Sequence, residues 1–287
     1  MGFIESWSKG WAFIKAAFAM AGQCKKLLLP SLYQLLVSLA YFIAWVGVLI
    51  AIEPQWSNTM WGIVSGIATL GSFIIFFFFN GMTVNMIDVH LKGGLPSVRA
   101  GAKDAGKNFP AIVFLSLIST VVDQFARAIG DEGSIIGRII GGIIEAVWTT
   151  LSFLLLPAII IEDAGFGQAM RRVRALHKGH MLLIGLGEVG VRGVTGLIGF
   201  VWFLLIFGVV YGSFTVLGGT PALVIAFVVG GGMLAMFVAF STYLRMAYYT
   251  CLYLWAVDVE RQGQEAPAPL PLAIALGHRR TGASRAA

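Results

Sequence analysis

Charged residues are scarce in this sequence. Asp, Glu, Lys and Arg make up 12% of its 287 residues, whereas hydrophobic residues make up 58%. A soluble globular protein carries about a quarter charged residues, and no water-soluble fold of this length could bury so much apolar surface. The scarcity of charge therefore excludes a soluble protein. Apolar runs that approach or exceed the ~20 residues needed to cross a bilayer indicate a polytopic membrane protein.

Cysteine is equally scarce, and the common catalytic signatures are missing. The two cysteines, Cys24 and Cys251, fall near the expected cytoplasmic surface, where thiols stay reduced. The sequence has no H-E-x-x-H, no Walker A motif and no G-x-S-x-G elbow. His177 and His180 share one loop, but no third metal ligand accompanies them. We therefore expect a protein that is not an enzyme, with no cofactor and no metal.

One stretch fits the glycine pattern of dinucleotide-binding proteins. It is Gly185-Leu-Gly187-Glu-Val-Gly190, which matches G-x-G-x-x-G. The fingerprint needs a strand before the glycines and an acid about 20 residues later. Here the chain continues apolar to Tyr211, and the next acid is Asp258. The stretch therefore predicts a glycine-rich membrane helix and no nucleotide site.

Six apolar blocks predict six transmembrane helices. They cover Leu27–Ile52, Met60–Ile87, Phe109–Ala126, Ser134–Ile161, Met181–Leu217 and Pro221–Val257. The expected fold is an all-α polytopic bundle. Residues 1–26 are expected to form an interfacial amphipathic helix, residues 27–260 the transmembrane domain and residues 261–287 a flexible cytoplasmic tail. A short helix around Leu270 to Leu276 is left open within that tail.

Basic residues predict the orientation, because Lys and Arg accumulate on the cytoplasmic side. Sixteen of the 20 fall in four segments that an even number of spans places together. They are Lys9, Lys15, Lys25, Lys26, Lys92, Arg99, Lys103, Lys107, Arg171, Arg172, Arg174, Lys178, Arg261, Arg279, Arg280 and Arg285. We expect a protein of the cytoplasmic (inner) membrane with both termini cytoplasmic. The positive charge is divided among four separate segments. This distribution fits attraction to anionic lipid headgroups and argues against nucleic-acid binding.

A unit of about 20 residues precedes every second span. The copies cover residues 8–30, 95–114 and 165–185, and each is basic, amphipathic and rich in small residues. A pair of returning spans follows each copy. The pattern predicts a threefold internal repeat of entry helix plus hairpin. The competing interpretation is that any cytoplasmic loop of a membrane protein is basic.

Two segments resemble an uncharacterised prokaryotic family of six-pass membrane proteins, a domain of unknown function. They are "FFFFNGMTVNMIDVHLKGGLPSVRAGAKDA" and "SFLLLPAIIIEDAGFGQAMRRVRALHKGH". The matching positions are Asn80, Gly93, Gly94, Trp148, Pro157, Glu162, Gly165 and Ala169. The architecture is also similar to membrane domains attached to glycerophosphodiester phosphodiesterases. The resemblance implies a fold and brings no activity, substrate or site.

Six ionisable residues fall within the expected spans, where charge is costly. They are Asp123, Arg127, Arg138, Glu145, Glu188 and Arg192. Helical spacing places each on a polar stripe with small residues, so we expect these stripes to face protein. One interpretation is a static ion-pair network in a non-enzymatic scaffold or accessory factor. The alternative is a transporter or channel for an ion or small solute that uses the charged core of the third to fifth expected helices. The sequence leaves open whether the chain binds a protein partner or forms a homo-oligomer.

Overall fold

The computed structural model describes the chain except residues 1–2, 52–56, 131–134, 264–265 and 277–287. The side chains of residues 3–6, 51, 58, 177–192 and 275–276 also lie outside the description. Every regular element within the described ranges is helical, which confirms the expected all-α fold.

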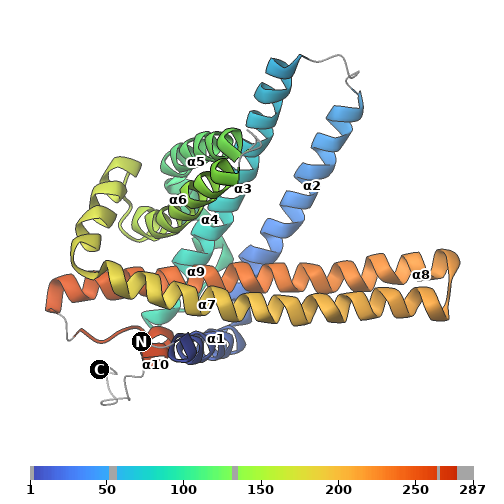
Figure 1. The fold of residues 1–287 in the computed structure, drawn as a ribbon. Coiled ribbons are helices and arrows are strands. Elements are labelled where there is room, and N and C mark those ends of the chain that lie inside the picture. Colours follow the sequence, from blue (N-terminus) through green and yellow to red (C-terminus); the bar gives the residue numbers. More distant parts are fainter. Residues whose placement is uncertain (1–2, 52–56, 131–134, 264–265, 277–287) are drawn as a thin grey trace. The chain divides into compact units, whose positions relative to one another are not determined.

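The helices follow the order that the apolar blocks predict (Figure 1). They are α1 (Phe3–Gln23), the 3₁₀ helix η1 (Lys25–Leu28), α2 (Leu29–Ala51), α3 (Asn58–Leu91), α4 (Val98–Lys107), α5 (Phe109–Gly130), α6 (Ile135–Ile161), α7 (Phe166–Val216), α8 (Gly219–Ile225), the π-helix η2 (Ala226–Gly230), α9 (Gly231–Gln262) and α10 (Leu270–Leu276).

Six segments of the described chain are long and apolar enough to cross a membrane, as expected. They are Lys25–Ile50, Thr59–Leu91, Phe109–Gly130, Ile135–Ile161, Gly193–Val216 and Gly219–Gln262. The third span is about one turn longer than the sequence indicated. The basic segment before the fifth span is continuous with it in the single helix α7. The stretch contains no proline that would separate the two.

The chain forms two compact units. Unit 1 comprises residues 1–28 and 176–287, and unit 2 comprises residues 29–175. In unit 2, α5 and α6 pack closely where Gly141 meets the backbone of α5. A Cβ atom at Gly141 would lie 2.6 Å from the carbonyl oxygen of Ala126. α4 approaches α3 in the same way, because a Cβ atom at Gly101 would lie 3.1 Å from the carbonyl oxygen of Met82. Small residues therefore determine which helices of unit 2 can touch.

Unit 1 packs α1 against α9 and α10, as Figure 1 shows near the N-terminus. The Tyr243 hydroxyl donates a hydrogen bond to the Ala17 carbonyl oxygen at 3.1 Å. Trp202 Nε1 donates to the Met233 carbonyl oxygen at 2.9 Å and joins α7 to α9. The short helix left open in the tail is present as α10, and its Leu272 is buried.

The order of elements follows the expected repeat in its first two copies. α1 precedes the pair α2 and α3, and α4 precedes the pair α5 and α6. The third copy differs, because α7 contains both the basic segment and the first span of its hairpin. Within this basic segment, Val173 is buried at 2% exposure. Its apolar side chain packs within the protein.

Candidate functional site

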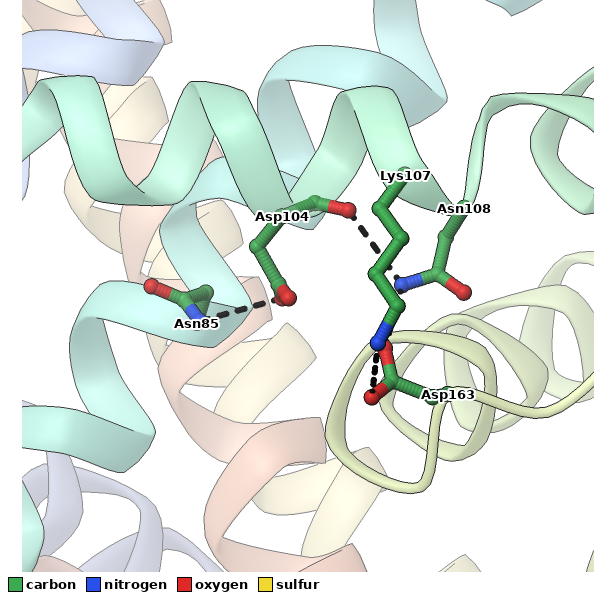
Figure 2. A network of polar contacts seen from close by, with 5 residues as sticks. All are labelled: Asn85, Asp104, Lys107, Asn108 and Asp163. Atoms are coloured by element: carbon green, nitrogen blue, oxygen red, sulfur yellow. Dashed lines mark hydrogen bonds and ion pairs between the residues drawn. The ribbon is translucent and has the colours of Figure 1, made fainter.

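A group of five polar residues lies where α3, α4, α5 and the turn after α6 meet (Figure 2). We call it the polar cluster, and its members are Asn85, Asp104, Lys107, Asn108 and Asp163. All five lie near the end of α3 that leads into the basic residues 92–107. We call this end of unit 2 the basic end. Three stretches of sequence supply these side chains, so the cluster connects segments that are distant along the chain.

Asp104 connects α4 to α3. Its Oδ2 atom accepts a hydrogen bond from Asn85 Nδ2 at 3.0 Å. Its carbonyl oxygen accepts from Asn108 Nδ2 at 3.2 Å, one turn later at the end of α4. Asp104 is positioned by the close approach of α4 to α3. Gly101, which has no side chain, and Ala105, whose side chain is small, allow this approach. The contact therefore follows from close helix packing.

Asp163 connects the end of α6 to α4 and α5. Its backbone adopts the left-handed conformation with φ at 50°, which only Asn, Asp and Gly tolerate at low cost. This conformation ends the helix, and Ala164 N donates to the Ile159 carbonyl oxygen at 3.1 Å. The carboxylate then accepts from Lys107 Nζ at 2.5 Å and from Asn108 Nδ2 at 3.0 Å.

The two carboxyl groups of the polar cluster are shifted in opposite directions. Burial raises the pKa of Asp104 above its ordinary value, and the neighbouring charge of Asp163 adds to that increase. Hydrogen bonds from Lys107 and Asn108 lower the pKa of Asp163. Asp163 is therefore held as a charged acceptor, whereas Asp104 carries its negative charge at a cost. Their neighbours explain both shifts.

The structure unites two of the six expected intramembrane charges. Arg127 Nε lies 3.1 Å from Asp123 Oδ2 within α5, at the i, i+4 spacing that the sequence indicated. The contact is an ion pair without hydrogen-bond geometry. Arg138 and Glu145 are exposed on α6, where no ion pair is found for either among the described residues.

The other expected residues are in the part of α7 whose side chains are not described. Glu188 and Arg192 lie there, as do His177 and His180. Whether Arg192 meets Asp123 or Glu145 therefore stays a prediction. In the described residues, no three His, Cys, Asp or Glu side chains come together as a metal site.

The polar cluster was not anticipated from the sequence, although two signals were present. Asp104 and Asn108 are one helical turn apart just before a span, and Asp163 follows the end of another. An ionisable residue within the sixth span, Arg245, was also left out of the expected set. The sequence alone gives no sign that Asn85, near the end of α3, contacts α4.

Deeper in unit 2, Asn80 joins α3 to α2. It is fully buried, and its Nδ2 atom donates to the Phe76 carbonyl oxygen at 2.7 Å and to Gln34 Oε1 at 3.2 Å. Its Oδ1 atom has no hydrogen-bond partner among the described residues. Ser31 Oγ and Asp88 Oδ1, also buried and in unit 2, share that condition. Buried polar atoms usually have a hydrogen-bond partner, so these three oxygens are exceptions within unit 2.

The helical spans and the polar cluster together define an all-α polytopic membrane protein. The model of a family of unknown function, DUF6159, matches residues 62–263, and the chain belongs to this family. The matched range runs from α3 to the end of α9 and includes the whole polar cluster. No curated protein matches the chain.

Proposed function

We propose that this protein is a non-enzymatic scaffold or accessory factor of the cytoplasmic membrane, with both termini cytoplasmic. The observation that carries the proposal is the polar cluster, because its contacts tie α3, α4, α5 and the turn after α6 into one framework. Its donors are engaged by other members of the cluster, as suits a structural role. The partner in such a role is a second copy of the chain or another membrane protein.

The proposal includes the expected architectural similarity to membrane domains attached to glycerophosphodiester phosphodiesterases. That similarity concerns architecture alone and describes the chain as a membrane module. Acids and bases at membrane depth would then serve to satisfy one another's charge, as Asp123 and Arg127 do within α5. Ion pairs of this kind often do no more than satisfy one another.

A second function, transport of an ion or small solute, is favoured by a different observation. The buried oxygens of Ser31, Asn80 and Asp88 lack partners among the described residues, and all three lie on α2 or α3. By the helical rise, Asn80 lies ~16 Å and Asp88 ~5 Å from Leu91 at the end of α3. A polar path from the basic end would pass these atoms and would not need the charges of α5, α6 and α7.

Flux measurements on the purified full-length protein distinguish the two functions. For a scaffold, proteoliposomes should conduct protons, Na⁺ and K⁺ no faster than protein-free vesicles. Transport along α2 and α3 would replace the scaffold proposal if flux exceeds that background. This flux should then be lost in Asn80→Leu and retained in the matched surface variant Ser97→Ala.

A further inference from the structure

The loop between α3 and α4 holds one apolar side chain away from the protein. Leu95 is 94% exposed, whereas the next residue, Pro96, is buried. Gly93 turns the chain with φ at 81°, and Gly94 N donates to the Val89 carbonyl oxygen at 2.8 Å. A Cβ atom at Gly94 would lie 3.1 Å from that same oxygen. The loop is therefore held tightly against α3, and this backbone fixes where Leu95 projects.

Two basic side chains follow on the outward face of α4. Arg99 and Lys103 are one helical turn apart and exposed, while Gly101 and Ala105 face α3. Neither base forms an ion pair within the described part of the chain. The face consequently carries two positive charges, and the exposed Leu95 precedes Arg99 by four residues in the loop that leads into α4.

Among the described residues, the nearby acids contact other groups and form no ion pair with Arg99 or Lys103. Asp88 Oδ2 lies 2.7 Å from Lys92 Nζ. Asp104 accepts from Asn85, and Asp163 is held by Lys107 and Asn108. The polar cluster thus leaves Arg99 and Lys103 available to an outside anion.

We propose that Leu95, Arg99 and Lys103 form a binding site for the headgroup of an anionic phospholipid. α3 and α5 both cross the membrane, so the intervening loop and α4 lie at its surface. The leucine side chain enters the acyl region, and the guanidinium and ammonium groups donate hydrogen bonds to headgroup phosphate. The inference rests on the proposed function only for placing α4 at the inner leaflet.

Native mass spectrometry of the full-length protein in detergent tests the site by titration with phosphatidylglycerol or phosphatidylcholine. A basic residue near an anionic lipid surface contributes about 1 kcal/mol, which is about fivefold in affinity. We expect Arg99→Gln and Lys103→Gln each to weaken phosphatidylglycerol binding about fivefold. Phosphatidylcholine binding should stay unchanged in both variants. Leu95→Ser should weaken binding of both lipids, because it removes an acyl-chain contact.

Arg171→Gln is the matched control, since Arg171 is also exposed and basic but lies on α7. If it weakens phosphatidylglycerol binding as much as Arg99→Gln, attraction is general to positive charge and the site is overturned. Equal binding of the two lipids by the unmodified protein would overturn it as well. Unchanged melting temperatures establish that the variants fold. Labelling of Ser97→Cys from each side of the membrane separately reports whether α4 is cytoplasmic, so that failure of the orientation is distinguished from failure of the site.

Discussion

Asn108 Nδ2 donates a hydrogen bond to Asp163 Oδ1 at 3.0 Å and so joins two residues that are 55 positions apart in the sequence. The bond connects the end of α4 to the turn after α6. With Lys107 on the same carboxylate, it makes Asp163 the point where the turn after α6 is linked to the end of α4.

Replacing Asp163 tests the contribution of this link to stability. Asp163→Asn keeps a residue that tolerates the left-handed backbone and keeps one oxygen acceptor, but it removes the charge that holds Lys107. We expect a loss of about 0.5–1 kcal/mol in the free energy of unfolding, because the pair is partly exposed. Lys107→Gln should cost a similar amount. The double variant should cost less than the sum, and additive losses in detergent unfolding would contradict a shared contact.

Replacing Asp104 tests the pH dependence of stability. Its pKa is raised in the folded protein, so the folded state binds a proton more tightly than the unfolded state does. Stability from this group is therefore present below its ordinary pKa and falls as pH rises through the raised value. Asp104→Asn keeps an oxygen for Asn85 and removes the costly charge.

The melting temperature of Asp104→Asn should exceed that of the unmodified protein at neutral pH. The difference should vanish at a pH below the ordinary pKa of aspartate. The contribution of Asp163 to stability depends on pH in the opposite direction. Its lowered pKa gives stability that is lost as pH falls through the pKa of the folded state. An Asp104→Asn variant that melts lower at neutral pH would show that its charge stabilises the fold.

Two adjacent glycines on α6 provide a matched test of helix packing. A Cβ atom at Gly141 would lie 2.6 Å from the Ala126 carbonyl oxygen, whereas one at Gly142 meets nothing within 4 Å. Gly141→Ala should cost about 1–3 kcal/mol, because backbone must move. Gly142→Ala should be neutral or stabilise by up to about 1 kcal/mol. Equal unfolding free energies of the two variants would disprove the close approach of α5 and α6.

Single cysteines at the two ends of α3 test the topology. Ser57 and Ser97 are exposed and lie on either side of the span Thr59–Leu91. In a background without Cys24 and Cys251, a membrane-impermeant thiol reagent should label Ser57→Cys from outside and Ser97→Cys only from the cytoplasmic side. Labelling of both from one side would exclude a span between them.

The wider ion-pair network is tested at Arg192. If this residue pairs with Asp123 or Glu145, Arg192→Ala should lower the free energy of unfolding by up to about 3 kcal/mol, since a carboxylate loses its partner at membrane depth. Arg127→Ala is the reference, because its contact with Asp123 is established. A melting temperature of Arg192→Ala equal to that of the unmodified protein would remove Arg192 from any structural network.

The apolar runs of the sequence are enough to predict an all-α membrane protein with six spans. Burial in lipid requires continuous apolar helices, and such runs can be identified in the sequence without knowing which helices pack together. Local spacing also indicated the Asp123–Arg127 pair, because residues one turn apart on a helix must be adjacent.

Only the tertiary structure decided which distant residues meet. Asn85, the pair Asp104 and Asn108 at the end of α4, and Asp163 come from three separate segments. Their contacts depend on how closely α4 lies on α3 and on how α6 ends. The tertiary structure also decides which face of α4 is buried. Gly101 and Ala105 lie on that face, where the backbone of α4 comes close to α3. Periodicity identifies a helix face, but the shape and polarity of the neighbouring helix determine what that face contacts.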